Sequence, residues 1–216
     1  MGMTQRSFEK KRGRSTRKRN PVLLLSVEGN NKTEKIYFSQ FRSQKQGSFR
    51  IEFASGSETD PAGMLESLKK DYKKLELSKE NDDIACVVLD LDCDAKKASL
   101  IQSLSHRKDN SAYLFIVSNP CFEVWFLLHF VFSTKSYLNQ NQILEELRQS
   151  DRIPHYKKNS DIAAVLQKYQ TNAIHNGNRL KAYHESQHKV WPSTDCNPAT
   201  DVVMLVEKIL EKLNCS

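Results

Sequence analysis

Four short segments rich in apolar residues stand out in the first part of the chain, at residues 22–27, 49–54, 84–91 and 112–117. Residues 49–54 alternate apolar and polar side chains, whereas the other three segments are almost continuously apolar. A continuous apolar run of this length is typical of a strand buried on both faces of a parallel sheet. Residues 33–41, 61–79 and 95–107 place apolar side chains at helical spacing. The alternation predicts an α/β fold with a mostly parallel sheet flanked by helices.

Residues 120–132 are apolar nearly all round, which predicts a buried helix. The pattern changes after residue 134. Amphipathic helices are then expected at residues 142–150 and 160–169, the second extending towards residue 188, and a last helix runs from residue 197 to 213. Residues 195–199 are interpreted as a turn leading into it. We therefore expect a disordered basic tail at residues 1–20, an α/β core at 21–134, and a helical C-terminal extension at 135–216 packed on the core.

Positive charge is concentrated at the start of the chain. The net charge is +7, and the first 20 residues hold eight cations and one acid, so the rest of the chain is neutral. Such a tail can bind nucleic-acid phosphates, although a solubilising terminus is an alternative. A basic and aromatic loop at residues 154–159 is a second candidate for phosphate contact, with a solvated linker as its alternative. The candidate nucleic-acid contacts are Arg12, Arg14, Arg17, Lys18, Arg19 and Lys157.

Other features of the sequence exclude several classes of protein. The five cysteines are scattered and form no CxxC pair, which argues against a secreted disulfide scaffold and a zinc ribbon. No apolar run reaches membrane-spanning length, and the N-terminus lacks a signal-peptide core. We therefore expect a cytoplasmic protein that contacts no membrane. Neither a GxxxxGK[ST] phosphate loop nor a GxSxG elbow is present, so the chain is not expected to hydrolyse ATP by itself.

Acidic residues gather where predicted strands end. Glu28 follows the first strand, and Glu34 lies in the first turn of the next helix. Asp90, Asp92 and Asp94 alternate at the end of the strand at residues 84–91. Alternate side chains of a strand share a face, and open α/β sheets bind ligands at the carboxyl ends of their strands. Carboxylates brought together there suit a hard cation, Mg²⁺ or Mn²⁺.

Each acid also has an ordinary structural explanation. Asp94 suits the N-cap of the helix that follows it, Glu34 complements a helix dipole, and Glu28 is an acceptable loop residue. Glu123 lies in an apolar helix and needs a partner, which could be a metal, an arginine or free backbone N–H groups. His129 is expected to be a hydrogen-bonded core histidine, with a role in a site as the alternative.

Residues 184–188 read HESQH and match the HExxH motif of zinc metalloproteases. The surrounding side chains of Lys181, Gln187 and Lys189 are polar, so the segment is expected to be exposed. Pro192 ends any helix soon afterwards, and no third ligand follows at metzincin spacing. We interpret the segment as a polar helix end, with a metalloprotease as a disfavoured alternative.

Glu28-Gly29 and Asp90-x-Asp92 together resemble the topoisomerase–primase (Toprim) pattern, in which a glutamate and a DxD pair hold Mg²⁺ at the sheet edge. A fuller set of motifs is similar to the RloB family, and this resemblance spans about residues 21–213. RloB proteins are encoded near bacterial restriction and abortive-infection systems, often beside an ATPase partner. The motifs are Val27-Glu28-Gly29, Thr33-Glu34, Asp90-Leu91-Asp92, the block from Ser118-Asn119-Pro120-Cys121-Phe122-Glu123 to His129-Phe130, and Asn197-Pro198-Ala199-Thr200.

A looser similarity links the chain to the overcoming-lysogenization-defect (OLD) nucleases, whose Toprim domains complete a two-metal site with a helix glutamate and a serine–glutamate pair. Glu34 matches the first, and Ser118 with Glu123 matches the second at a spacing one residue longer. No clear lysine counterpart is present, and Lys157 or Lys158 is a candidate.

The resemblance implies a Toprim-like nuclease that cuts DNA or RNA, including tRNA, in anti-phage defence. Glu28, Glu34, Asp90 and Asp92 would be catalytic. One or two Mg²⁺ or Mn²⁺ ions would be held by these residues with Asp94 and Glu123, and Ser118, His129 and Lys158 would support the site. A non-catalytic nucleic-acid-binding or adaptor subunit is the alternative, although a binder has no reason to gather carboxylates where it meets phosphates.

Overall fold

The computed structural model describes residues 19–28, 32–42 and 49–214, and these residues form one five-stranded sheet in the order β2-β1-β3-β4-β5. The first four strands run parallel, and β5 pairs antiparallel with β4. The predicted α/β class with a mostly parallel sheet is therefore confirmed. The strands are β1 (Val22–Val27), β2 (Arg50–Phe53), β3 (Ile84–Asp90), β4 (Tyr113–Asn119) and β5 (Ala199–Thr200).

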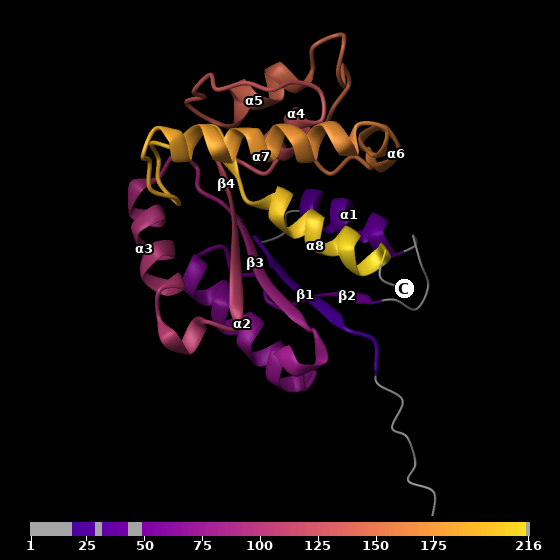
Figure 1. Cartoon of the computed structure of the whole chain (residues 1–216), viewed down its shortest axis with the longest axis vertical. Helices are drawn as coiled ribbons and strands as arrows, with labels where there is room; N and C mark the ends of the chain where they lie inside the picture. Colours follow the sequence, from indigo (N-terminus) through magenta and orange to yellow (C-terminus); the bar gives the residue numbers. More distant parts are fainter. Residues whose placement is uncertain (1–18, 29–31, 43–48, 215–216) are drawn as a thin grey trace, which may run out of the picture.

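Helices cover both faces of the sheet. In Figure 1, α2 and α3 lie on one face and α1 and α8 on the other, while α4 to α7 gather towards the carboxyl ends of the central strands. The α-helices of the described residues are α1 (Thr33–Ser39), α2 (Pro61–Lys74), α3 (Ala95–Ser105), α4 (Glu123–Leu128), α5 (Gln140–Leu147), α6 (Ala163–Gln167), α7 (Gln170–Ser186) and α8 (Val202–Asn214). Short 3-10 turns occur at Gln40–Arg42, Lys79–Asn81 and Lys108–Asn110.

The apolar runs in the sequence arise because the sheet is buried on both faces. In β1, Leu23 and Leu25 pack into the core beneath α1, α4, α7 and α8. The alternate residues, Val22 and Leu24, pack into the core beneath α2 and α3. Because both faces of the strand are removed from water, an aliphatic side chain on either face stabilises the fold by burial. The strand therefore shows no alternation of apolar and polar residues.

Several helices end earlier than their patterns predict. α2 stops at Lys74 rather than at residue 79, because Glu76 adopts a left-handed conformation with φ 52°. The Leu77 N–H then donates to the Tyr72 carbonyl at 3.1 Å, and this bond closes the helix end. The helix predicted at residues 120–132 is confined to α4, and the one predicted from residue 160 is divided into α6 and α7.

The last strand was missed by the sequence reading. Residues 195–199 were expected to be a turn, and the final helix was expected to start at residue 197. Instead Ala199 and Thr200 pair with Asn119 and Ser118, and α8 starts at Val202. A two-residue strand is too short for a periodicity of two to be visible. Its pairing adds the fifth strand to the sheet beside the end of β4.

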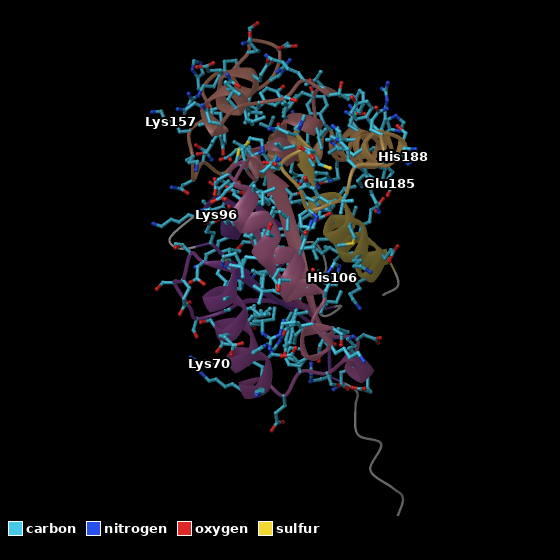
Figure 2. The ribbon with its side chains drawn as sticks, turned by 90° about the vertical axis from the view of Figure 1, so that its left-hand side faces the viewer. Lys70, Lys96, His106, Lys157, Glu185 and His188 are labelled. Carbon is cyan, nitrogen blue, oxygen red and sulfur yellow. The ribbon has the colours of Figure 1, made fainter. Side chains whose placement is uncertain are left out.

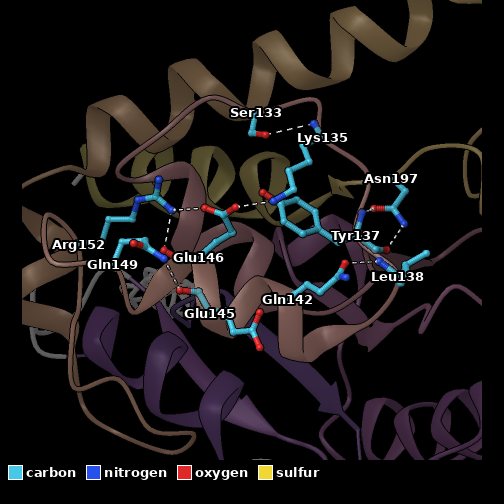
Figure 3. A network of polar contacts seen from close by, with 10 residues as sticks. All are labelled: Ser133, Lys135, Tyr137, Leu138, Gln142, Glu145, Glu146, Gln149, Arg152 and Asn197. Atoms are coloured by element: carbon cyan, nitrogen blue, oxygen red, sulfur yellow. Dashed lines mark hydrogen bonds and ion pairs between the residues drawn. The ribbon is translucent and has the colours of Figure 1, made fainter.

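Polar contacts hold the segment around α5 in place, as Figure 3 shows. The Lys135 ammonium donates to Glu146 at 2.7 Å, and Arg152 donates to the other Glu146 oxygen at 3.0 Å. The Asn197 amide accepts from the Tyr137 N–H at 3.0 Å and donates to the Tyr137 carbonyl at 2.7 Å. The Glu146 bonds attach α5 to the segments before and after it, and the Asn197 bonds attach the segment before α5 to the chain that leads into β5.

Asp83 lies at the amino ends of β1 and β3, at the opposite end of the sheet from the carboxyl ends of these strands. Its carboxylate accepts from Arg19 Nη1 at 2.9 Å and from the backbone N–H groups of Val22 and Ser78, each at 2.8 Å. Burial alone would raise the pKa of Asp83, but these hydrogen bonds outweigh it and hold the pKa below its usual value. Arg19 therefore has a structural partner at the edge farthest from the carboxyl ends of the strands.

His129 lies in the core directly after α4, as the sequence predicts. Its Nδ1 is 2.9 Å from the Trp125 carbonyl, and because a carbonyl can only accept, Nδ1 carries the proton. The ring packs edge-on against Trp125 and is fully buried. Burial lowers the pKa of His129 to about 4, so the ring is neutral at pH 7.

We expect Asp83→Ala to lower the free energy of unfolding by about 1–3 kcal/mol at pH 7, because the buried Val22 N–H, the part-buried Ser78 N–H and Arg19 lose their acceptor. Urea unfolding measures this change, with Asp109→Ala, an exposed ion-pair residue, as the control that leaves the midpoint nearly unchanged. Because the folded pKa of Asp83 is depressed, its stabilising effect is lost as the pH falls through that value. Equal midpoints for the two variants would contradict the assignment.

We expect His129 to make the protein less stable in mild acid. The unfolded chain binds a proton at His129 below about pH 6.5, whereas the folded chain does so only below a pKa of about 4. Between pH 7.5 and pH 5 this difference costs about 2 kcal/mol. His129→Gln should flatten that part of the pH dependence in urea unfolding, and His175→Gln, on the exposed face of α7, should not. Parallel pH profiles for both variants would count against the buried neutral ring.

Candidate functional site

Asp90 is the centre of a group of five carboxylates at the carboxyl edge of the sheet. It is the last residue of β3 and is 7% exposed. Burial raises the pKa of Asp90 well above its usual value, and the charges of Glu34, Glu123, Glu28 and Asp92 raise it further. The acids that the sequence assigned to one edge therefore lie close enough together to interact electrostatically.

Glu34 approaches Asp90 from the first turn of α1. Its side chain is buried, and its Oε2 has no hydrogen-bond partner among the described residues. Burial raises the pKa of Glu34 to about 7, and Glu123 raises it as well, whereas the ammonium of Lys158 acts in the opposite direction. An unpartnered buried carboxylate oxygen is costly unless a cation or a proton satisfies it.

Glu123 occupies the first turn of α4 and is held by two neutral donors. Gln140 Nε2 donates to one carboxylate oxygen at 3.0 Å, and the Tyr156 hydroxyl donates to the other at 3.2 Å. None of the three partners expected from the sequence supplies these contacts. Both donors come from the chain after residue 135, so that segment fixes the orientation of an acid in the α/β part of the fold.

Asp92 and Glu28 form the outer side of the acid group and share one cation. The Lys97 ammonium lies 2.9 Å from Asp92 Oδ2 and 3.1 Å from Glu28 Oε1, and the lysine side chain is 13% exposed. Glu28 Oε2 also accepts from the Asp90 N–H at 3.2 Å. The sequence reading missed Lys97 and considered Lys157 and Lys158 instead. The feature of the sequence that could have identified Lys97 is its position in the first turn of the helix that follows Asp90 and Asp92.

The strand ends at Asp90 and the backbone turns sharply at Asp92 and Cys93, so the expected alternation of the Asp90 and Asp92 side chains stops at Asp90. Asp92 and Cys93 both have φ 56°, in the left-handed region that non-glycine residues seldom adopt. The Asp92 N–H donates to the Pro120 carbonyl at 2.9 Å, and the Cys93 N–H donates to Asn119 Oδ1 at 3.2 Å. This turn directs Asp92 outwards, where its side chain is 58% exposed.

Asp94 caps α3. Its Oδ1 accepts from the backbone N–H groups of Lys96 and Lys97 at 2.7 and 3.2 Å, as the N-cap interpretation predicts. The side chain is exposed. Asp94 therefore contributes to the acid group through the start of α3, because the cap fixes the helix turn from which Lys97 reaches the two outer carboxylates.

The loop at residues 154–159 lies against the start of α1. Asn159 Oδ1 accepts from the Lys32 N–H at 3.1 Å, and the Asn159 N–H donates to Thr33 Oγ1 at 3.2 Å. These bonds place Lys158 near Glu34, consistent with its effect on the Glu34 carboxyl group. Lys157 is exposed and lies on the same side of the molecule as Lys96 (Figure 2).

The remaining predicted site residues take different places. The Ser118 and Thr200 hydroxyls are 2.8 Å apart, and Ser118 pairs in register with Asp90, so it supports the edge from β4. His129 contacts Trp125 in the core, and Arg19 lies at the opposite edge. Arg12, Arg14, Arg17 and Lys18 lie outside the described residues.

The HExxH segment does not form a zinc-binding helix face. His184 is buried, contrary to the expected exposure, and its Nε2 is 2.7 Å from the Pro198 carbonyl. His188 lies beyond Ser186, the last residue of α7, and has φ 56°. The two imidazoles therefore do not lie one helical turn apart on a continuous helix, as the motif requires.

The donor set around Asp90 fits a hard divalent cation. It consists of carboxylate oxygens, the group is partly buried, and Glu34 Oε2 lacks a partner. No set of three His, Cys, Asp or Glu side chains in the described ranges already has the geometry of a metal site. Binding an ion would therefore require the acids to move towards one another, which their mutual repulsion opposes until a cation is present.

We expect Lys97→Met to lower the free energy of unfolding by about 1–3 kcal/mol in EDTA at pH 7.5, because Glu28 and Asp92 lose the cation between them. Lys96→Met removes an exposed ammonium from the same helix turn and should leave stability nearly unchanged. Urea unfolding of the three proteins makes the comparison. If Lys97→Met unfolds at the same urea concentration as Lys96→Met, the bridging role of Lys97 is wrong.

No helix of the described residues is long and apolar enough to cross a bilayer.

Comparison with known proteins gives one family and no individual relative. No curated protein and no solved structure matches the chain. The family described as RloB-like protein matches residues 23–209, which include β1 from its second residue, β2 to β5, all five acids around the carboxyl edge and Lys97. The chain belongs to the RloB-like family.

Proposed function

We propose that this protein is a Mg²⁺- or Mn²⁺-dependent nuclease that cleaves phosphodiester bonds in DNA or RNA. The observation that carries the proposal is the gathering of Glu28, Glu34, Asp90, Asp92 and Glu123 at one partly buried edge. Like charges placed together in low dielectric are costly, and Lys97 neutralises only the outer pair. A divalent cation would remove the repulsion among the inner acids.

Asp90, Glu34 and Glu28 are the residues best placed to hold such a cation, with Asp92 and Glu123 completing the group. One or two bound ions would supply Lewis-acid stabilisation of the phosphoryl oxygens and lower the pKa of a bound water. Gln140 and Tyr156 hold the Glu123 carboxylate in one orientation. The Lys97 ammonium holds the Glu28 and Asp92 carboxylates in place and compensates part of their negative charge.

A phosphate backbone could reach the acids along a shallow cleft beside Asp92. The cleft has a volume of about 410 Å³, and its walls include Thr59, Asp94, Lys96 and Lys97. Exposed Lys157 lies on the same side of the molecule as Lys96 (Figure 2). Lys97 of α3 contacts two of the acids, and Lys158 of the loop at residues 154–159 acts on Glu34, so both elements place cations beside the acids. This distribution would attract phosphates at the rim of the site while the acids hold metal.

The alternative is a non-catalytic nucleic-acid-binding or adaptor subunit. Such a protein needs the cations but gains nothing from five acids beside them, since carboxylates repel phosphates. The resemblance to the RloB family implies a place beside restriction and abortive-infection systems, and this supports a role in anti-phage defence within the bacterial cytoplasm. The ATPase often encoded beside RloB genes is the proposed partner that regulates cleavage.

We expect cleavage of plasmid, single-stranded DNA or total RNA in Mg²⁺ or Mn²⁺ and none in EDTA. Asp90→Asn keeps the shape of the side chain and should lower the rate at least about 100-fold, equivalent to about 2.7 kcal/mol of barrier. Asp109→Asn, an exposed acid in the turn before β4, is the matched control and should cut normally. Gel assays of all three proteins, with tRNA as a separate substrate, make the test.

If nothing is cut, the assay is repeated with the proposed ATPase partner added. Absence of cleavage in both assays, together with equal nucleic-acid binding by wild type and Asp90→Asn, would overturn catalysis in favour of the adaptor. Calorimetric titration with Mn²⁺ alone provides an independent result. Wild type should bind the ion and Asp90→Asn should bind it at least about 10-fold more weakly.

A further inference from the structure

An open groove runs between α1 and α6 and is separate from the cleft beside Asp92. It consists of two adjoining hollows of about 540 and 630 Å³, which share Gln40, Asp161 and Ala163. In Figure 1, α6 lies above α1. Each hollow has the volume of a pocket for a molecule the size of a nucleotide, about 300–1,000 Å³. We call this feature the α1–α6 groove.

The α1 wall of the groove carries two cations. Lys32 is exposed and Lys35 is half-buried, and neither ammonium has an ion-pair partner among the residues that the structure describes. The contact of Lys32 with Asn159 uses the backbone N–H and leaves the side chain available. Asp161 is the acid in the walls, and its Oδ1 accepts from the Ala163 N–H at 3.1 Å. The ammonium groups outnumber this carboxylate, so the groove favours an anionic ligand.

The rest of the wall is largely apolar. Ile36 lines the groove from α1, and Ile162, Ala163 and Val165 line it from the start of α6. The Val165 side chain is 38% exposed. The bases of an unpaired strand can pack their flat faces on such a surface, whereas a duplex keeps those faces stacked inside. Cations beside apolar side chains therefore suit the phosphates and bases of a single strand.

The groove begins next to the acid group. Lys32 is two residues before Glu34, and the Asn159 N–H donates to Thr33 Oγ1 at 3.2 Å. This contact holds Lys158 where its ammonium opposes the rise in the pKa of Glu34 that burial causes. Lysines of α1 and of the loop at residues 154–159 therefore lie along the way from the groove to the acids.

The α1–α6 groove and the cleft beside Asp92 belong to opposite faces of the sheet. Phe38 of α1 packs into one core, and Ile101 of α3 packs into the other. From α3, Lys96 and the 40% exposed Leu100 line the cleft beside Asp92. Each of the two features thus combines lysine with apolar side chains, and the acids at the carboxyl edge lie between them.

We propose that an unpaired nucleic-acid strand crosses the acid group, with nucleotides on one side of the scissile bond in the α1–α6 groove and those on the other side in the cleft beside Asp92. The inference rests on the proposed nuclease function and adds its substrate class. Lys32 and Lys35 bind phosphates in the groove, and bases pack on Ile36 and Val165. A strand held on both sides needs no free end at the acids, so cleavage is internal.

Binding in EDTA tests the groove separately from cleavage. Fluorescence anisotropy measures the affinity of the full-length protein for labelled oligo-dT and oligo-U strands of about 20 nucleotides, and for a duplex of equal length. Replacing Lys32 and Lys35 together by methionine should weaken strand binding at least about 5-fold. The slope of log K against log salt should fall by about 1.4, since each phosphate contact contributes about 0.7. Duplex binding should change little.

Lys70→Met is the control for this pair of substitutions. Lys70 is exposed on α2 and lies well below Lys96 and Lys157 in Figure 2, so its loss should alter neither affinity nor salt slope. The basic residues near the N-terminus are the same in every variant, so differences between variants report the groove. An equal loss of strand and duplex binding would overturn the assignment of the groove to an unpaired strand.

Ala163→Glu and Ala163→Gln form a matched pair of nearly equal size. Ala163 is the first residue of α6 and lines both hollows, and either substitution keeps the N–H that donates to Asp161. The glutamate should weaken strand binding at least about 5-fold relative to the glutamine, because it repels phosphates. Thermal melting establishes that both variants fold. Equal strand affinities for the folded pair would show that the groove is not the binding surface.

A closed circular single strand tests internal cleavage. In Mg²⁺ or Mn²⁺ the wild type should cut the circle, and Ala163→Glu should cut it at least about 5-fold more slowly than Ala163→Gln. Digestion of a linear strand with the circle left intact would overturn the two-sided path. If neither is cut, with or without the proposed ATPase partner, the nuclease function fails and internal cleavage fails with it. The anisotropy result still decides whether a strand occupies the groove.

Discussion

Repulsion among carboxylates is the constraint around which this fold is arranged. Asp90 is the last residue of the central strand, and its side chain is buried. Four more acids approach it from the end of β1, from α1, from α4 and from the turn after β3. A core gains stability by excluding charge, so a fold that places five acids at one edge must supply compensation. The structure does so unequally. Lys97 serves the outer pair, neutral donors serve Glu123, and Glu34 keeps an oxygen without a partner.

The chain after residue 135 is best understood through this constraint. It does more than cover apolar surface, because Gln140 and Tyr156 hold the Glu123 carboxylate, and Asn159 fixes a basic loop at the start of α1. Neutral donors orient a carboxylate without cancelling its charge, so the acid group keeps its attraction for a cation. An arginine in the same place would have satisfied Glu123 and weakened that attraction.

The sequence predicted the sheet well because burial on both faces leaves an unmistakable apolar run in β1, β3 and β4. The sequence also predicted that Glu28, Glu34, Asp90 and Glu123 lie near one another, since the carboxyl ends of parallel strands meet at one edge of the sheet. The direction of Asp92 did not follow, because a left-handed turn depends on the distant Asn119 and Pro120 rather than on local pattern. Lys97 was missed because a lysine in a first helical turn is ordinary, and only the folded position of Glu28 makes it a bridge.

Asn119 links the acid edge to a part of the chain that is made much later. Its Oδ1 accepts from the Cys93 N–H in the turn that directs Asp92, and its Nδ2 donates to the Cys196 carbonyl at 2.8 Å. About a hundred residues separate the two ends of this bridge, so closing it is a long-range contact that carries the entropy cost of a large loop. During synthesis the acids emerge well before the segment that braces their turn. The order of translation thus keeps the acid edge incomplete until nearly the whole chain is present.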